Sequence, residues 1–320
     1  MIDLSPVLSA ARLAADLTRR VQRLHLNGSD KGGGHDPVTI ADYGSQAILL
    51  RTISRAYPND GVLAEESGEQ FAALVDESQR AMIVRLVGDV IGEPVTEAEL
   101  VTWLDWGRGR DSARMWVIDP VDGTKGFLAG RRYSIAIAPL ENGIPAAGVL
   151  ASPGYGSVDG LGLLFYAQGG LCLIEPISGG TARRAHVSKR SDPAEWRVVE
   201  SVERAHAHLE RMHNVYRALG VPQDHVESID SQDKYAMIAA GDADLMLRLP
   251  RDQEYGHKIW DHAAGWSLVT TAGGTVTDVD GTPLDFSRGS ELPNAGMIVT
   301  NGSAHDRVVA VVQGILSARE

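Results

Sequence analysis

The sequence predicts a layered α/β fold, built from an N-terminal half of helices and hairpins and a C-terminal half in which strands and helices alternate. Apolar residues recur at helical spacing over residues 8–24 and 40–53, and strand and turn signals then crowd residues 115–175. Further along, short apolar runs alternate with helical patterns, which is typical of an α/β arrangement. We therefore expect an N-terminal α+β half over residues 1–155 and a C-terminal α/β half over residues 156–320.

The composition is that of a globular protein and argues against a polyanion-binding one. Of the 320 residues, 43% are apolar and 22% are charged, which is enough for a sizeable core, and the net charge is −12. Nucleic acids and anionic membranes demand a basic face, so we expect neither as a partner. With a single cysteine, Cys172, no signal-peptide pattern and no apolar run near ~20 residues, the sequence predicts a soluble, cytoplasmic protein.

The first elements are two helices separated by a glycine-rich segment. The first helix ends at Asn27-Gly28, and residues 29–35 are expected to form a loop. That loop, which contains Gly32, Gly33 and Gly34, is either a solvated linker or a lid that contributes to a third metal site. Thr39 is expected to cap the second helix, which stops before Pro58.

Strands and a helical insertion follow. Residues 61–64 form a short apolar strand, residues from about 67 to 112 a helical insertion, and residues 115–118 the next strand. Two hairpins are then expected, the first through the turn Glu141-Asn142-Gly143. In the second half, strands are predicted near residues 197–200, 229, 245–249 and 275–277, and helices at 206–219, 234–240 and 261–271.

Two aspartates three residues apart come directly after an apolar strand. Asp119 and Asp122 lie in a turn that Pro120 stiffens and Gly123 relieves. Mg²⁺ prefers oxygen ligands and keeps waters or substrate phosphate in its remaining positions, so this turn is a candidate half-cage for the ion. Thr124 would begin a helix whose free N–H groups face a phosphate. Taken alone, the pattern also fits an ordinary aspartate turn.

Four further acidic residues, at three places in the sequence, have ordinary explanations when each place is taken alone. Glu65 and Glu66 at a strand end, and Asp42 one turn into its helix, fit acids that complement a helix dipole. Asp261 fits a helix N-cap. Their order along the chain is more informative than any one of them.

That order, a helix aspartate, a strand-end glutamate pair, an aspartate turn and a later Trp-Asp-His-Ala-Ala-Gly, resembles the lithium-sensitive inositol monophosphatase superfamily. The amino-acid sequence of these motifs most closely resembles the 3′(2′),5′-bisphosphate nucleotidase branch of that superfamily, and the resemblance covers residues 36–300. The segments that carry the resemblance are Asp119-Pro120-Val121-Asp122-Gly123-Thr124-Lys125-Gly126-Phe127, Ile229-Asp230-Ser231-Gln232-Asp233-Lys234-Tyr235, Leu247-Arg248-Leu249-Pro250 and Lys258-Ile259-Trp260-Asp261-His262-Ala263-Ala264-Gly265.

The resemblance implies a fold, a metal site and a reaction. The fold is the layered α+β sandwich of inositol monophosphatase and fructose-1,6-bisphosphatase, and the reaction is Mg²⁺-dependent hydrolysis of the 3′-phosphate of adenosine 3′,5′-bisphosphate or of its sulfated form, which suggests sulfate assimilation. Two or three Mg²⁺ ions and inhibition by Li⁺ are implied. The implied metal ligands are Glu65, Asp119, the Val121 carbonyl, Asp122 and Asp261. The pair implied to orient and deprotonate the attacking water is Asp42 and Thr124.

The same resemblance implies how the substrate, a small nucleotide bisphosphate, is bound. The matching positions are Thr124, His206, Ser231, Lys234, Arg248 and Asp261. At the first histidine, His208 is the alternative to His206. Ala64, where the family commonly has glycine, is a departure that restricts the backbone before Glu65.

Three other functions and two assemblies stay open at this point. Inositol polyphosphate 1-phosphatase or inositol monophosphatase specificity would use the same metal machinery. A catalytically silent nucleotide sensor is a second alternative. A Ser-His-Asp esterase is disfavoured because no G-x-S-x-G elbow is present. A monomer and a homodimer fit the sequence equally.

Overall fold

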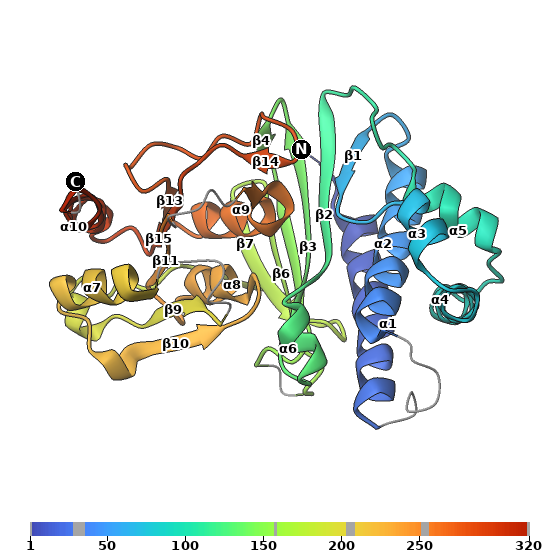
Figure 1. Cartoon of the computed structure of the whole chain (residues 1–320), viewed down its shortest axis with the longest axis horizontal. Coiled ribbons are helices and arrows are strands. Elements are labelled where there is room, and N and C mark those ends of the chain that lie inside the picture. The colour runs from blue at the N-terminus through green and yellow to red at the C-terminus, as the bar shows by residue number, and fades with distance from the viewer. Residues whose placement is uncertain (1, 28–35, 157–158, 203–208, 251–255, 319–320) are drawn as a thin grey trace.

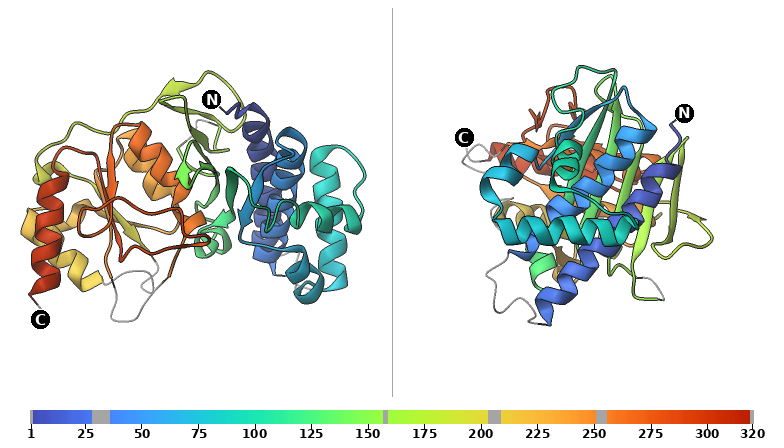
Figure 2. Two further views of the ribbon diagram at one scale, coloured as in Figure 1. Left: turned by 90° about the horizontal axis from the view of Figure 1, so that it is seen from above. Right: turned by 90° about the vertical axis from the view of Figure 1, so that its right-hand side faces the viewer.

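The computed structural model describes residues 2–27, 36–156, 159–202, 209–250 and 256–318, and it has the layered architecture that the sequence predicts. Figure 1 shows helices α1 and α2, a first sheet, helices α8 and α9, a second sheet, and helices α7 and α10 following one another along the long axis. Helices α4 and α5 cover the outer side of α1 and α2, and the view from above in Figure 2 shows the same order.

The N-terminal helix pair packs on the first sheet, and the second helix begins earlier than predicted. Helix α1 spans Ser5–Leu26 and α2 spans Pro37–Ala56, which stops before Pro58 as expected. The cap of α2 is Asp36, whose side chain accepts a hydrogen bond from the Val38 N–H at 3.0 Å. The predicted cap, Thr39, is wrong because Pro37, which lacks an N–H, already suits the first helical position. The glycine-rich segment 29–35 lies outside the described residues.

The predicted helical insertion is confirmed as three short helices with separate caps. They are α3 (Gly68–Leu74), α4 (Glu77–Ile91) and α5 (Glu97–Leu104). Each begins after a Ser, Asp or Thr whose side chain accepts an N–H of the first turn, which satisfies a backbone donor that the helix leaves free.

The first sheet contains both predicted hairpins. Its strand order is β1-β2-β3-β5-β6-β7-β8, with β4 paired to β3, and only β1 and β2 are parallel neighbours. Asn142 and Gly143 form the first turn at φ values of 51° and 76°, in the left-handed region that these residues tolerate best. The strands are β1 (Gly61–Ala64), β2 (Arg114–Asp122), β3 (Ser134–Glu141), β4 (Ile144–Pro145), β5 (Gly148–Ser152), β6 (Leu163–Gln168), β7 (Leu171–Pro176) and β8 (Arg183–Arg184).

The second sheet has the order β10-β9-β11-β15-β13. Its predicted alternation with helices is confirmed, whereas β15 and α10 were not predicted. The strands are β9 (Val198–Ser201), β10 (Val226–Ile229), β11 (Leu245–Arg248), β13 (Thr275–Thr277) and β15 (Met297–Thr300), and β12 (His257–Lys258) pairs separately with β14 (Glu291–Leu292). The helices are α7 (Leu209–Leu219), α8 (Asp233–Ala240), α9 (Ala263–Thr271) and α10 (His305–Ser317), and short 3₁₀ turns are η1 (Pro193–Glu195), η2 (Gln223–His225) and η3 (Ile259–Asp261).

The first sheet continues past residue 155, and the two halves of the chain share a buried core. Strands β6, β7 and β8 continue the first sheet, and the change of sheet comes between Arg184 and Val198. One buried cluster combines Val117 and Leu150 of the first sheet with Leu268 of α9 and Val299 of the second. A division into domains at residue 155 stays a prediction. None of the helices in the described ranges has the length and apolar character needed to cross a membrane.

Candidate active site

A bulge in β2 turns two aspartates to one side of the sheet. In a regular strand, residues three apart point to opposite faces. Asp119 pairs with Ala136 and Asp122 pairs with Ser134, so three steps on β2 correspond to two on β3. The extra residue restores the phase, and both aspartates therefore face the same side of the sheet.

The parallel pairing of β1 and β2 carries a glutamate to the same edge. Ala64 is in register with Ile118, so Glu65, which directly follows β1, lies beside Asp119 of β2. Helix α2 is hydrogen-bonded to the segment after β1 and to the last part of β2. Gln46 exchanges two hydrogen bonds with the backbone of Glu66, at 2.8 and 3.0 Å, and the Ser45 hydroxyl donates to the Pro120 carbonyl at 3.0 Å. Asp42, one turn earlier on α2, is thereby held against the glutamates, whose charges act on it.

The C-terminal half closes on this edge through the loop before α8. The backbone N–H of Gln232 donates to Asp122 Oδ2, and its side chain donates to the Trp260 carbonyl at 3.0 Å, next to Asp261. Gly123 makes the approach possible: a Cβ there would lie 2.8 Å from Ser231 Cβ, and its φ of 96° also favours glycine. Gln232 was missed by sequence reasoning, because it contacts Asp122 through a backbone group that every residue type carries.

One helix start differs from expectation. Helix α6 (Thr124–Leu128) does begin at Thr124, directly after the aspartate turn. One of the N–H groups expected to face a phosphate, that of Gly126, instead donates to Asp230 Oδ2 at 2.8 Å. The short helix therefore uses that donor to bind the loop of the second half.

Lys234 is buried and contacts the protein's own backbone. Its Nζ donates to the carbonyls of Ile229 at 2.9 Å and Ser231 at 2.8 Å, and its side chain is only 6% exposed. Burial lowers its pKa to about 8, although Asp122 opposes the shift. These bonds hold the loop that carries Ser231, whose hydroxyl oxygen accepts the Asp233 N–H at 3.2 Å.

Of the remaining residues predicted to bind the substrate, the structure describes Arg248 but not His206 or His208. Arg248, at the end of β11, is half-buried, and its charge acts on both Asp122 and Asp261. It therefore lies on the carboxylate side of the second sheet. His206 and its alternative His208 lie outside the described residues.

Burial, and for most of them the charges of the neighbouring carboxylates, raise the pKa values of the converging acidic side chains. Burial, followed by Glu65 and Asp122, raises the pKa of Asp119 well above its ordinary value. Desolvation and the charge of Asp261 raise the pKa of Asp122 to about 7, and desolvation with Glu66 raises that of Glu65 to about 8. These clustered carboxylates repel one another when they are ionised, and a hard divalent cation bound by their oxygens would offset that repulsion. Among the described residues, no three His, Cys, Asp or Glu side chains are grouped closely enough to hold one ion.

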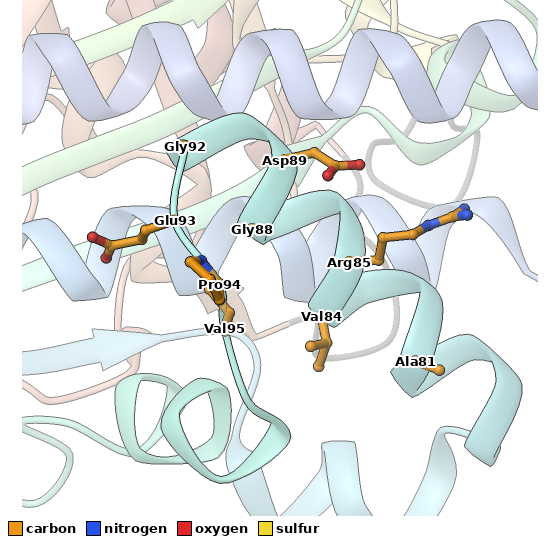
Figure 3. A pocket seen from close by; sticks show the side chains of 9 residues that line it. All are labelled: Ala81, Val84, Arg85, Gly88, Asp89, Gly92, Glu93, Pro94 and Val95. Atoms are coloured by element: carbon orange, nitrogen blue, oxygen red, sulfur yellow. The ribbon is translucent and has the colours of Figure 1, made fainter.

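The surface has a hollow elsewhere that contains none of these residues. It measures about 680 Å³ and lies on the insertion, between α4 and the turn that follows it (Figure 3). Its walls include Val84, Pro94 and Val95, and it is separate from the carboxylate cluster in sequence and in lining.

Comparison with known proteins places the chain in a family. The family model described as "Inositol monophosphatase family" matches residues 3–317. The chain belongs to this family. Among curated relatives, a 3′(2′),5′-bisphosphate nucleotidase of Oryza sativa is 37% identical, with 97% of this chain and 93% of that protein covered, and one of Emericella nidulans is 34% identical, with 96% of both covered.

Solved structures of the inositol monophosphatase family confirm the predicted fold. An inositol monophosphatase from Anabaena superposes with a TM-score of 0.63 at 23% identity, covering 98% of this chain and 97% of that one. The suppressor protein SuhB of Bartonella henselae gives a TM-score of 0.65 at 22% identity, covering 97% and 98%. At such identities the likeness concerns the fold alone.

For this inositol monophosphatase family member, we expect Mg²⁺ to stabilise the fold more strongly as the pH rises. The ordinary pKa values of Asp122 and Glu65 are 3.8 and 4.5, and the folded protein raises both. Raised values mean that stability without metal is fullest below those ordinary values and falls as the pH rises through about 7 to 8. A cation offsets this loss, since it competes with protons for the same oxygens.

The measurement is thermal unfolding with and without saturating Mg²⁺ at about pH 5 and about pH 8. The Mg²⁺-induced rise in Tm should be larger at the higher pH, and NaCl at equal ionic strength serves as the control for screening. An equal rise at both pH values would show that these carboxylates do not bind the ion.

Proposed function

We propose that this protein is a Mg²⁺-dependent phosphatase that hydrolyses the 3′-phosphate of adenosine 3′,5′-bisphosphate to AMP and phosphate, with the sulfated analogue as a second substrate. The observation that carries the proposal is the convergence of acidic side chains from α2, β1, β2 and η3 with Arg248 of β11, at the junction of the two sheets. The curated relatives that share nearly the full chain carry the matching name.

The metal site is proposed from the donors at the strand ends. Two or three Mg²⁺ ions, when bound, would neutralise phosphate charge and acidify a water. The proposed ligands are Glu65, Asp119, the Val121 carbonyl, Asp122 and Asp261. The chain's own contribution is to gather these oxygens from three segments and to hold Asp122 by the N–H of Gln232.

Asp42 and Thr124 are proposed to orient the attacking water and to accept its proton. Burial and the charges of Glu65 and Glu66 raise the pKa of Asp42 well above its ordinary value. A general base works best when its pKa is close to the working pH, so a raised value suits this role. Thr124 is exposed at the start of α6, where its hydroxyl can reach a bound substrate.

Substrate binding is proposed for Thr124, His206, Ser231, Lys234, Arg248 and Asp261. Arg248 offers a guanidinium fork, which matches a phosphate geometrically. Two of the three donors of Lys234 are already taken by carbonyls, so it contributes its charge and the shape of the Ser231 loop more than a direct contact.

The deciding experiment measures phosphate release from adenosine 3′,5′-bisphosphate, its sulfated form, inositol 1,4-bisphosphate, inositol 1-phosphate and fructose 1,6-bisphosphate, with Mg²⁺ and with EDTA. We expect the adenosine compounds to be turned over fastest and EDTA to stop the reaction. Preference for an inositol phosphate would select the alternative specificity on the same machinery. No release from any of them would leave a nucleotide-binding sensor.

The setting of the reaction is also proposed. The one cysteine, Cys172, is buried and has no partner for an intrachain disulfide, which fits the reducing cytoplasm. The substrate is a small molecule, and the net charge of −12 favours neither nucleic acid nor an anionic membrane as a partner.

Lithium is expected to inhibit turnover. Li⁺ is close to Mg²⁺ in size but carries half its charge, so in the carboxylate cluster it would stabilise phosphate charge less well. The measurement is the initial rate at saturating substrate with LiCl, NaCl or KCl added at equal concentration. Inhibition by LiCl at about millimolar levels, and little by the other salts, is the expected result. Equal rates in all three salts would contradict it.

A further inference from the structure

We propose that a buried hydrogen-bond chain, Tyr235–His262, positions the Arg248 guanidinium for a phosphate of the substrate. This rests on the proposed function and adds two positioning residues to it. The three residues come from different elements: Tyr235 from α8, His262 from the start of α9, and Arg248 from the end of β11.

The distances link the three side chains in one line. The Tyr235 hydroxyl lies 2.9 Å from His262 Nδ1, and His262 Nε2 lies 3.1 Å from Arg248 Nη1. His257 Nδ1 lies 3.4 Å from the same guanidinium nitrogen. Tyr235 is 2% exposed and His262 1%, so water does not compete for these bonds.

One assignment of donors and acceptors satisfies the contacts among Tyr235, His262 and Arg248. A guanidinium only donates, so His262 Nε2 must accept and the imidazole must be neutral with its hydrogen on Nδ1. That hydrogen is donated to the Tyr235 oxygen, and the tyrosine hydroxyl in turn donates to the Met297 sulfur at 3.4 Å. The tyrosine thus selects the histidine tautomer that accepts from Arg248.

Occupying Nη1 determines which edge of Arg248 remains for a ligand. The Nε and Nη2 donors point the same way and form the side edge of the guanidinium, which suits two phosphate oxygens. Within the described residues, the hydrogen bonds of Arg248 use Nη1 alone, so this side edge is left for the anion. Tyr235 itself is locked by packing, because a Cβ on Gly265 of α9 would lie 2.3 Å from its ring.

The first test is Tyr235→Phe, which removes one oxygen and keeps the ring. Without the phenol, His262 gains freedom to place its hydrogen on Nε2, where it would face the guanidinium donor. We expect KM for adenosine 3′,5′-bisphosphate to rise by about 5-fold to 20-fold with kcat changed much less. The matched control is Tyr133→Phe, which removes a hydroxyl equally buried but bonded to Thr18 at 2.8 Å, on the helix side of the first sheet. Its KM should stay within about 2-fold of wild type.

The second test separates positioning from general support by a double-mutant cycle. If Tyr235 acts through Arg248, the effect of Tyr235→Phe on KM should disappear when Arg248→Ala is already present. At His262, Gln keeps an acceptor near the Nε2 position and Phe does not, so His262→Gln should retain more affinity than His262→Phe. Additive effects in the cycle, or equal loss in Gln and Phe variants of similar Tm, would overturn the proposal.

A binding measurement keeps this inference distinct from the proposed function. Equilibrium binding of adenosine 3′,5′-bisphosphate to the whole protein in Ca²⁺, followed by calorimetry, needs no turnover. Weaker binding by Tyr235→Phe but not by Tyr133→Phe supports the proposed hydrogen-bond chain from Tyr235 to Arg248, even if the enzyme prefers another substrate. Equal binding by wild type and Tyr235→Phe contradicts it even if the wild type is an active bisphosphatase.

Discussion

Asp119→Asn is expected to lower kcat by at least about 100-fold while the protein stays folded. The substitution removes the charge of a proposed metal ligand but keeps its shape. Asp119 is 3% exposed, and the Oδ1 that accepts the Val121 N–H at 3.2 Å has an equivalent in asparagine. Because burial and the neighbouring carboxylates raise the pKa of Asp119, the neutral amide should also relieve repulsion. The Tm without metal should therefore not fall, and the Mg²⁺-induced rise in Tm should shrink.

The matched control is Asp60→Asn, a carboxylate equally buried but at the far end of β1. Asp60 accepts from Arg114 Nε at 2.6 Å and from Trp116 Nε1 at 2.8 Å, so its loss should lower the Tm while kcat stays within about 3-fold of wild type. The measurements are phosphate release at saturating Mg²⁺ and thermal unfolding of both variants. Near-normal kcat for Asp119→Asn would refute the metal assignment.

Arg248→Ala is expected to lower kcat/KM for adenosine 3′,5′-bisphosphate by about 10-fold to 100-fold, since a hydrogen bond to a charged group contributes ~1.5–3 kcal/mol. An aryl phosphate has no second phosphate to contact, so its turnover should change by less than about 3-fold. The comparison of the two substrates is the informative quantity, because general damage to the site would lower both.

Arg190→Ala is the control for Arg248→Ala. Arg190 is half-buried and bonded to Asp244 at 2.7 Å, near the opposite end of β11, so its loss should lower the Tm without changing the ratio of the two activities. Equal loss on both substrates in Arg248→Ala would instead assign Arg248 to structural support of the site. Inositol phosphate specificity would then become the better proposal.

The site as a whole is built by strand ends, and this is why it was predictable in outline. Glu65 directly follows β1, and the last residues of its parallel neighbour β2 include Asp119 and Asp122, which were expected in a turn after a shorter strand. Residues near the carboxyl ends of neighbouring parallel strands lie at one edge of the sheet. The order of acidic motifs could therefore be assigned to a family, which the comparisons confirm. The same reasoning applied to the alternation of strands and helices in the second half, which the structure also confirms.

The register of β2 against β3 and the sheet that β6 to β8 would join could not be predicted from motif order. The face to which Asp122 points depends on one extra residue in β2, and a bulge is a relation between two strands that neither reveals alone. The boundary near residue 155 was inferred from local turn signals, but sheet pairing depends on which edges meet in space, and β6 to β8 join the first sheet.

By itself, the sequence determined the fold class and the enzyme family, because hydrophobic period and motif order are properties of the chain, and it predicts the metal-binding carboxylates. The tertiary structure alone decided where Lys234 and His262 point. A lysine three residues after Ser231 is predicted at the substrate, and the structure shows that its ammonium donates to the carbonyls of residues 229 and 231. Likewise, His262 was part of a motif without a role until packing brought Tyr235 to one of its nitrogens and Arg248 to the other.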